Sequence, residues 1–460
     1  MSQKELIVDT PDLKTRNMLL NMGPSHPAMH GIIKIVVSLD GEVIEKADVE
    51  IGYLHRSFEK HCESGNWTQA IPYVDRLNYV SPLINNFAYA QTAEKLLGID
   101  VTERCKYIRV LMSEISRVSD HLTCIGASTM ELGAFSVFLY MIKAREYLWE
   151  LIEDVTGARV TVSYARIGGV KADLPEGFTE KTRATIGRVR EVLKECDALV
   201  TNNRIFYDRM RGVGAISRED AISYGITGPF LRSTGVSYDV RKAQPHWVYD
   251  RVQFDVPVGT KGDNYDRYLV RFEEMHQSLR IIEQCLDQIP PGPVNVDGTG
   301  KVVNLDELPA VLPSAQMADL GKFGLTEGLQ QREPILEATL AGGEGSSYSG
   351  INVDAKGVVL PPKKQTYSNI EALMNHFKLV MLDHGIRPPK GEAYFCTEGG
   401  NGELGFYIVS DGSDRPWRVR VHPPCFPIMS ALGELLIGSM IADVVPTFGS
   451  VNMIGGELDR

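Results

Sequence analysis

The chain is organised around one short stretch, Asn21-Met-Gly-Pro-Ser-His-Pro-Ala-Met-His-Gly31. Pro24 and Pro27 fix their own φ angles and push the preceding residues towards extended backbone. The glycines allow turns that other residues avoid. We therefore expect a shaped loop that presents His26 and His30. Because histidine titrates near neutral pH, such a loop is typical of a functional site; the alternative is a strand-connecting turn whose histidines are only solvated.

The bulk composition is that of an ordinary globular protein. The chain has 460 residues, of which 43% are hydrophobic and 23% are charged, enough for one large or two ordinary domains. Its net charge of −11 argues against binding to nucleic acid or directly to anionic lipid. No apolar run approaches the ~20 residues of a membrane span. Residues 1–16 lack the apolar centre of a signal peptide, so we expect the chain on the cytoplasmic side.

The cysteines exclude the common metal-binding patterns. No two of the seven form a Cys-x-x-Cys pair. This spacing predicts reduced, inert thiols, with neither a structural zinc nor a cysteine-ligated iron–sulfur cluster within this chain. The cysteines are Cys62, Cys105, Cys124, Cys196, Cys285, Cys396 and Cys425.

An N-terminal β-rich region is expected over residues 1–60, with the histidine loop inside it. Residues 32–37 are rich in β-branched side chains, and Asp40-Gly41 is a hairpin signal before the returning strand at 43–51. A short helix is predicted over residues 52–60.

A helical bundle is predicted for residues 61–292. Apolar residues at spacings of three and four predict long helices, which should pack together. These helices cover residues 108–125, 138–155, 186–199 and 269–289. Gly126 and Gly133 predict a break that contains Glu131. The capping box at residues 217–220 predicts a short helix, and Tyr79 lies in a segment bounded by prolines at 72 and 82.

The last third of the chain changes character. Residues 293–365 have weak apolar periodicity and are rich in glycine and proline, which predicts a surface insertion. The C-terminal region, residues 366–460, should mix helices and strands. It is predicted to contain a helix beginning at the capping box 368–371 and ending at Gly385, strands over 392–396, 404–409 and 417–421, and a final helix over 428–443. The fold class is therefore α+β, with a central bundle of long helices.

The chemistry-bearing motifs are few. The sequence has no phosphate-binding P-loop, and its G-x-G-x-x-G match at residues 400–405 lies between two predicted strands rather than before a helix, so we do not expect this chain to bind NADH itself. It also lacks H-E-x-x-H and G-x-S-x-G. Titratable groups on unusual backbone remain, and together they could protonate a substrate that gains electrons. They are His26, His30, Asp75, Arg76, Tyr79 and Glu131. Spacing alone does not show that they meet.

Several long motifs resemble one family, in the same order along the chain. They are Gly23-Pro-Ser-His-Pro-Ala-Met-His-Gly31, Pro72-Tyr-Val-Asp-Arg-Leu-Asn-Tyr-Val-Ser81, Thr201-Asn-Asn-Arg-Ile205, Phe254-Asp-Val-Pro-Val-Gly259, Gly262-Asp-Asn-Tyr-Asp-Arg-Tyr268 and Gly456-Glu-Leu-Asp-Arg460. They resemble the quinone-site D subunit of respiratory complex I, the proton-pumping NADH:quinone oxidoreductase. The resemblance covers almost the whole chain except about residues 295–362.

The resemblance implies an oxidoreductase and translocase component of the respiratory electron-transport chain. Its substrate would be quinone, reduced by electrons from the [4Fe–4S] cluster of the B subunit and protonated in a step coupled to proton translocation. NADH and FMN would bind in other subunits, and this chain would carry no cofactor or metal. The C subunit and the H subunit, which lies in the membrane, would be further partners. The chain would be a peripheral protein on the cytoplasmic side of the bacterial inner membrane.

By motif, the family's catalytic pair corresponds to Tyr79 and His30, which would contact the quinone headgroup. Glu131 matches an acidic residue that pairs with the histidine and is usually aspartate, so this chain carries one extra methylene there. Asn78 likewise replaces a common aspartate. The remaining residues expected to support the site are His26, Asp75 and Arg76.

The family in turn resembles the large subunit of nickel–iron hydrogenases, which hold their metals with two Cys-x-x-Cys pairs. In this sequence Asn78 and Ser81 stand at the first pair's places, and no counterpart of the second pair follows Cys425. The resemblance therefore implies a hydrogenase-like fold without the metal site.

Two other functions are compatible with these residues. The first is the same quinone chemistry in a related complex fed by ferredoxin or reduced deazaflavin. The second is a non-catalytic scaffold that docks the iron–sulfur and membrane arms. A scaffold would not need Tyr79 or the His30 loop, so their presence argues against it. Only the partner subunits distinguish the complex fed by ferredoxin or deazaflavin from complex I.

Overall fold

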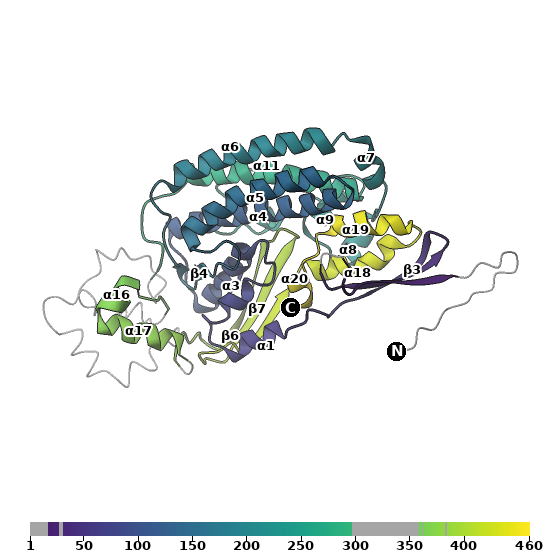
Figure 1. Ribbon diagram of the computed structural model, residues 1–460. Helices are drawn as coiled ribbons and strands as arrows, with labels where there is room; N and C mark the ends of the chain where they lie inside the picture. Colours follow the sequence, from purple (N-terminus) through teal and green to yellow (C-terminus); the bar gives the residue numbers. More distant parts are fainter. Residues whose placement is uncertain (1–16, 27–30, 297–357, 362, 382–383) are drawn as a thin grey trace, which may run out of the picture.

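The computed structural model describes residues 17–26, 31–296, 358–361, 363–381 and 384–460. Long helices form one layer of the molecule, and a sheet with shorter helices lies beneath them (Figure 1). The long helices are α4 (Glu103–Glu131), α5 (Phe135–Thr156), α6 (Phe178–Val200) and α11 (Asn264–Gln288). Each of the four long helices predicted from apolar spacing is thereby confirmed.

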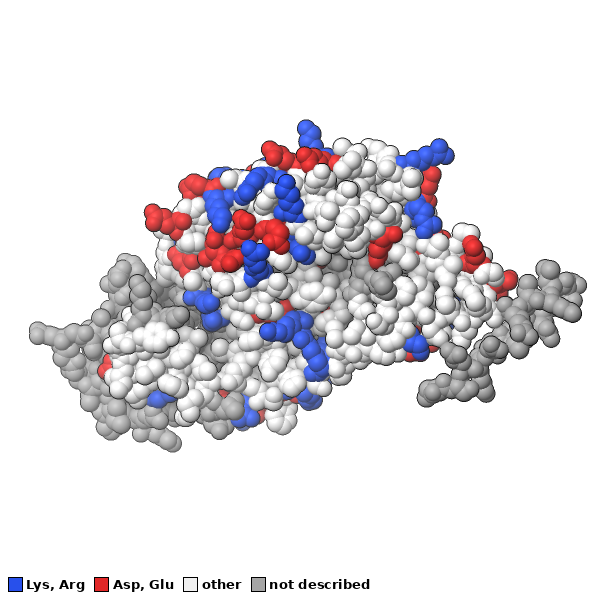
Figure 2. Space-filling model, viewed as in Figure 1, with Lys and Arg blue, Asp and Glu red and all other residues white. Residues whose placement is uncertain are grey.

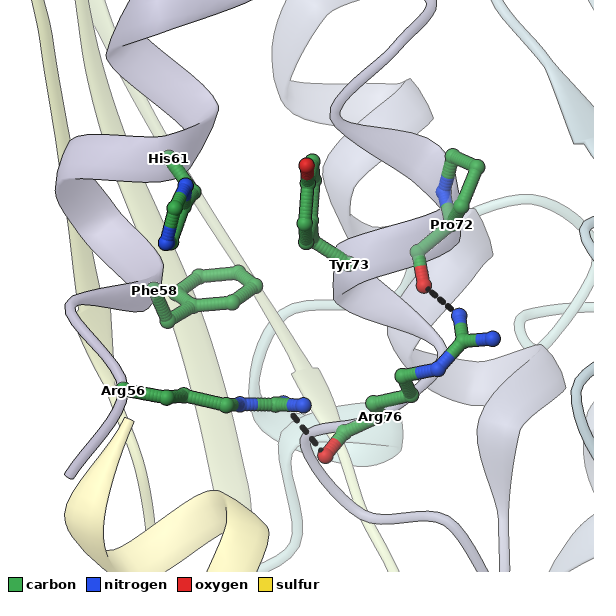
Figure 3. Close-up of a pocket in the computed structure, with 6 residues that line it drawn as sticks. All are labelled: Arg56, Phe58, His61, Pro72, Tyr73 and Arg76. Carbon is green, nitrogen blue, oxygen red and sulfur yellow. Dashed lines mark hydrogen bonds between the residues drawn. The ribbon is translucent and has the colours of Figure 1, made fainter. Parts of the chain in front are cut away.

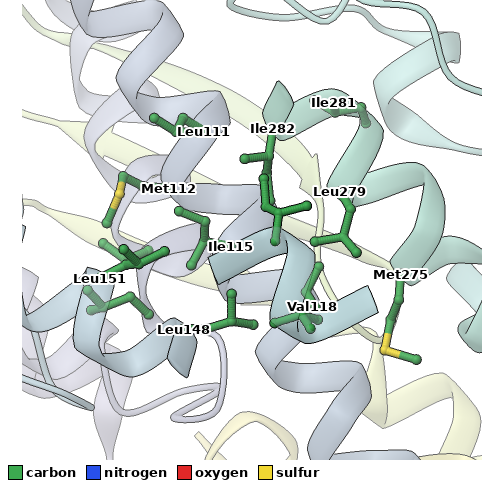
Figure 4. Packing of buried hydrophobic residues seen from close by; sticks show 14 of the residues in the cluster. Leu111, Met112, Ile115, Val118, Leu148, Leu151, Met275, Leu279, Ile281 and Ile282 are labelled. Carbon is green, nitrogen blue, oxygen red and sulfur yellow. The ribbon is translucent and has the colours of Figure 1, made fainter. Parts of the chain in front are cut away.

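The interior of this layer is apolar. Ile115 and Val118 of α4 face Leu148 of α5 and Leu279 of α11, and all four side chains are fully buried (Figure 4). Each such side chain contributes roughly 1.5–3 kcal/mol on burial. Because α4 lies between α5 and α11, it is the central element of the bundle.

The break predicted at Gly126 was wrong, because α4 continues to Glu131. Gly126 instead allows α5 to approach closely, since a Cβ there would lie 3.1 Å from the Cβ of Met141. The chain turns only at residues 132–134, where Gly133 has a φ of +92°. Glu131 therefore stands on the last turn of a rigid helix.

The N-terminal strands form an antiparallel sheet in the order β1 (Met18–Met22), β2 (Lys34–Asp40) and β3 (Val43–Glu50). The predicted hairpin at Asp40-Gly41 is confirmed. A further bridge pairs Ser25 with Ile32 and closes the base of the histidine loop between β1 and β2.

The helix predicted over residues 52–60 was wrong in its position. Helix α1 (Phe58–Ser64) begins later. The backbone N–H groups of Gly52 and Leu54 instead donate to the carboxylate of Asp459, at 2.9 and 2.7 Å. These contacts with the C-terminal end of the chain hold the segment outside a helix.

The second sheet contains β6 (Gly391–Glu398), β7 (Glu403–Ser410) and β8 (Arg418–His422), all antiparallel. These strands confirm the three predicted in this region. Helix α3 (Pro82–Leu97) packs on β6 and β7, and α1 packs on β8.

The single final helix predicted over residues 428–443 was also wrong. Helix α18 (Cys425–Leu436) ends early, because Gly438 turns the chain with a φ of +77° and its N–H donates to the carbonyl oxygen of Ile44 at 2.8 Å. The 3₁₀ helix η2 (Ile441–Asp443), α19 (Val444–Val451) and α20 (Gly455–Asp459) follow. The C-terminus thus ends in the middle of the molecule (Figure 1).

Short elements connect these parts. They are α2 (Ile71–Val74), β4 (Ala165–Arg166), β5 (Gly169–Val170), α7 (Arg204–Met210), α8 (Arg218–Ser223), α9 (Gly228–Ser233), α10 (Val240–Ala243), α16 (Lys363–Ser368) and α17 (Ile370–Val380). The capping box before α8 is confirmed, since the hydroxyl of Ser217 accepts from the N–H of Asp220 at 3.0 Å.

The capping box predicted at Ser368 was wrong. Ser368 is the last residue of α16, and Asn369 caps α17 by accepting from the N–H of Glu371 at 2.8 Å. Helix α17 ends at Val380 rather than at Gly385. Most of the predicted insertion lies outside the described residues, and the division into four regions stays a prediction.

Charged side chains gather over the long-helix layer in the view of Figure 2, whereas the area over α18 and α19 carries few. Within the described ranges, no helix has the length and apolar character needed to cross a membrane.

Candidate functional site

Tyr79 stands out in the loop between α2 and α3. Its neighbours Asn78 and Val80 are buried, whereas Tyr79 itself is 42% exposed. Its hydroxyl has no hydrogen-bond partner among the residues that the structure describes. Partial burial raises the pKa of Tyr79, and the nearby Asp120 carboxylate adds to the effect. The phenol therefore stays protonated and can donate a hydrogen bond to a ligand.

The base of the histidine loop belongs to the same part of the core. Met22 and Ile33, which flank the loop, are in one buried apolar cluster with Val80. His26 is partly buried. His30 lies outside the described residues, so its predicted place opposite Tyr79 stays a prediction.

Glu131 lies against helix α19. A Cβ at Gly449 would be 2.4 Å from the Oε2 atom of Glu131, so the glycine makes room for this carboxylate. Because His30 lies outside the described residues, the expected pairing of Glu131 with His30 stays a prediction.

Asp75 has a different environment from Tyr79. Its carboxylate is fully buried and accepts two hydrogen bonds from Ser163, from the N–H at 2.8 Å and from the hydroxyl at 2.7 Å. Burial raises its pKa. These contacts fix the end of α2 to the segment before β4, which is a structural task.

Arg76 lines a surface pocket of about 390 Å³ (Figure 3). The guanidinium of Arg76 donates to the carbonyl oxygen of Pro72, and Arg56 donates to the carbonyl oxygen of Arg76 at 2.7 Å. The rings of His61 and Tyr73 stack with their centroids 5.5 Å apart. The remaining lining residue is Phe58. Two guanidinium groups without a carboxylate in the lining make this pocket suited to an electron-rich group.

Asp120 was not singled out from the sequence. It is fully buried on α4, and its carboxylate accepts from Asn78 at 2.9 Å, from Ser81 at 2.8 Å and from Asn452 at 3.0 Å. In the sequence it falls on the polar side of an amphipathic pattern. The sequence would have pointed to Asp120 only if it had shown that both sides of this helix are buried. The packing of the folded chain shows this, and the sequence pattern does not.

Cys425 and Glu457 extend this polar cluster. Asn401 donates to the sulfur of Cys425 at 3.3 Å, and the N–H of Cys425 donates to Glu457 at 3.2 Å. Burial raises the pKa of Glu457 to about 7, with the charge of Asp120 adding to the shift. Burial also raises the pKa of Cys425 well above its usual range.

Asn78 and Ser81 thus lie in one buried cluster with Cys425; their correspondence to a hydrogenase cysteine pair stays a prediction from the resemblance. Asn78 and Ser81 donate there to the Asp120 carboxylate, and the sulfur of Cys425 accepts from Asn401. In the described part of the chain, no three His, Cys, Asp or Glu side chains are grouped as metal ligands. The absence of a metal centre stays a prediction.

Comparisons with known proteins agree along the chain. Residues 131–322 and 329–460 match the family described as "Respiratory-chain NADH dehydrogenase, 49 Kd subunit". The D 1 subunit of the NADH-quinone oxidoreductase of Sorangium cellulosum is 51% identical, over 98% of this chain and 97% of that protein. The D subunit of the Myxococcus xanthus enzyme is 46% identical, over 97% and 94%. The C/D subunit of the Bdellovibrio bacteriovorus enzyme is 44% identical, over 97% of this chain and 70% of that protein.

These matches define the class of protein: one subunit of a respiratory oxidoreductase complex that takes part in electron transport. The chain belongs to the family of the 49-kDa subunit, the D subunit of NADH-quinone oxidoreductase. The family resemblance drawn from the motifs is confirmed. Its partners are other subunits of that complex.

Proposed function

We propose that this chain forms the quinone headgroup site of its complex. Tyr79 donates a hydrogen bond to one quinone carbonyl oxygen, and His30 contacts the other. The observation that carries the proposal is the half-exposed Tyr79 between Asn78 and Ser81, which are both buried and hydrogen-bonded to Asp120. Such a donor is held ready for a ligand rather than used by the fold.

Electrons arrive from the [4Fe–4S] cluster of the B subunit, after NADH is oxidised at FMN elsewhere in the complex. The quinone takes up two electrons and two protons to become quinol. Tyr79 and His30 supply protons and regain them from the solvent side. The positive pocket of Arg56 and Arg76 supports this assignment, because it favours electron-rich groups beside the Tyr79 segment. A charge left on the site would be costly wherever water is excluded, which suits coupling to proton translocation.

The same proposal places the chain at the cytoplasmic side of the bacterial inner membrane, in contact with the B and C subunits and with the H subunit in the membrane. The relative from Bdellovibrio bacteriovorus is named as a C/D subunit, which supports contact with the C subunit. The relatives are named for NADH, which favours this donor over ferredoxin or deazaflavin. Mass spectrometry of the purified complex should find an NADH-oxidising flavoprotein.

The direct test is Tyr79→Phe in the assembled complex. The change removes one donor and little volume, so assembly should survive. One lost hydrogen bond to a reacting oxygen costs on the order of 1–3 kcal/mol, so quinone reduction should fall roughly 10- to 100-fold. The iron–sulfur clusters should still be reduced by NADH, as measured by electron paramagnetic resonance.

The matched control is Tyr407→Phe. Tyr407 lies on β7 and donates its hydroxyl to Glu392, so its loss removes a phenol hydroxyl outside the site. This variant should keep its activity. Full turnover of Tyr79→Phe with short-chain quinones would refute the assignment of the site.

A further inference from the structure

Beneath Tyr79 lies a buried carboxylate that the proposed site does not use. We infer that Asp120 is a positioning residue for quinone reduction, which fixes the Tyr79 segment and places a negative charge beneath the phenol. The inference rests on the proposed function, because it concerns the same tyrosine. It adds a residue from the middle of α4 to a site otherwise built from loops.

The first observation is how Asp120 holds the segment. Asn78 and Ser81 stand on either side of Tyr79 in the chain, and both donate to the same Oδ2 atom of Asp120, at 2.9 and 2.8 Å. The side-chain oxygen of Asn78 also accepts from the N–H groups of Val80 and Ser81, at 3.1 and 3.3 Å. The turn that carries Tyr79 is therefore closed on itself and anchored to a helix.

The second observation is what lies on the other side of the carboxylate. Asn452 donates to Oδ1 of Asp120 at 3.0 Å and also contacts Asn401 at 2.5 Å. The turn between β6 and β7 approaches so closely that a Cβ at Gly400 would lie 2.2 Å from Oδ2. Asp120 therefore joins α4, the Tyr79 segment, the end of α19 and the β6–β7 turn.

The third observation concerns charge. Within the described ranges, no salt bridge joins Asp120 to a lysine, arginine or histidine. Its hydrogen-bond donors are amides and a hydroxyl, which are neutral and supply no positive charge. Buried charges without a cationic partner act strongly on their surroundings.

The pKa of Tyr79 depends on this charge. The groups that face it are Asp120 from α4 and Cys425 from α18, with Glu457 of α20 behind them and Arg76 on its own segment. Burial is the largest cause of its raised pKa, followed by Asp120 and then Cys425. The negative charge favours the protonated phenol, so Tyr79 stays a donor and recovers its proton after donating it.

The test is Asp120→Asn in the assembled complex, assayed for reduction of a short-chain quinone across about pH 7–11, a range that extends above the ordinary pKa of tyrosine, because the pKa of Tyr79 is raised. The amide keeps the shape and removes the charge. We expect turnover about 3- to 10-fold lower, as for one weakened hydrogen bond. The alkaline limb of the pH profile should move to lower pH by on the order of half a unit, because removing a like charge lowers the pKa of the phenol.

A swap variant separates charge from shape. Exchanging the two side chains, as Asn78→Asp with Asp120→Asn, keeps one amide and one carboxylate in the same contact and returns the charge beside Tyr79. We expect it to recover turnover and to restore the alkaline limb. If Asp120→Asn does not assemble, the swap variant carries the test, and a limb displaced to lower pH in it would overturn the inference.

The matched control is Asp263→Asn. Asp263 is also fully buried, and its carboxylate accepts from the N–H groups of Gly212 and Asp266, both at 2.8 Å. It should leave the pH profile unchanged. An unshifted profile for Asp120→Asn, or an equal shift for Asp263→Asn, would overturn the inference. Full activity of Tyr79→Phe would instead refute the proposed function, so the two failures are distinguishable.

Discussion

Two buried polar regions share helix α4 and differ in how their charges are compensated. The first, the ion network, joins carboxylates and guanidinium groups within the bundle. Its members are Glu114, Arg117, Arg232, Asp239, Arg241, Glu274 and Glu398. The second is the Asp120 cluster, which begins one turn further along the helix and uses amides, a hydroxyl and a thiol.

The ion network pairs each charge closely. Arg232 contacts Glu398 at 2.7 Å and Glu274 at 2.9 Å, and Arg241 contacts Asp239 at 2.6 Å. Burial alone would raise the pKa of Glu274, but Arg232 and the other cations outweigh it and hold that pKa well below its usual range. The network therefore fixes α9, α10, α11 and β6 to α4.

The Asp120 cluster lacks this compensation, and its second acid, Glu457, has a pKa raised to about 7. This difference in charge compensation shows that burial and hydrogen bonding alone do not identify a functional group. A charge matched by opposite charges holds the fold, whereas a charge matched only by neutral donors can still act on its neighbours.

The largest effect should come from breaking the ion network. Arg241→Met removes one of the cations that contact Asp239 and Glu274, so the buried carboxylates of the network lose part of their compensating charge. Such losses cost about 3–5 kcal/mol, so the free energy of unfolding from denaturant titration should fall by this amount. A loss no larger than that of an exposed ion pair would contradict the role given to the network.

A smaller effect, of opposite sign, should follow Glu457→Gln. The pKa of Glu457 rises from its usual 4.5 to about 7 in the folded protein. Below about pH 4.5 both states hold the proton; between pH 4.5 and 7 only the folded state keeps it, so wild-type stability falls as pH rises.

Glutamine can still accept the hydrogen bond from Cys425 but does not ionise. The variant should therefore gain stability relative to wild type as pH rises through this window, by on the order of 3 kcal/mol at pH 7. Thermal unfolding of both proteins at several pH values measures the difference. A difference that does not change with pH would contradict the assignment.

The smallest effect should come from an exposed pair. Arg190 of α6 and Glu283 of α11 meet in two contacts at 2.7 and 2.8 Å, with side chains 44% and 33% exposed. Surface pairs contribute about 0–1 kcal/mol and weaken with salt. Arg190→Met should change unfolding by no more than this amount, and the change should shrink in high salt. If Arg190→Met lowered the free energy of unfolding as much as Arg241→Met, buried and exposed ion pairs would not differ in their contribution to stability.

Local signals predicted the elements that depend on local chemistry. Apolar spacing gave the long helices, and Asp40-Gly41 gave the hairpin, because side-chain periodicity and turn preference are properties of neighbouring residues. The errors at residues 52–60 and 428–443 have a different cause. There, contacts with Asp459 and Ile44 compete with helix formation, and such contacts join distant parts of the chain.

The same division holds for the site. The sequence by itself determined the family and placed Tyr79 in a segment bounded by prolines. Only the tertiary structure showed that Asp120 lies beneath this segment, together with Asn401, Asn452 and Glu457 from the end of the chain. The physical reason is that periodicity shows which side of a helix is apolar. It does not show which polar groups the fold brings against the other side.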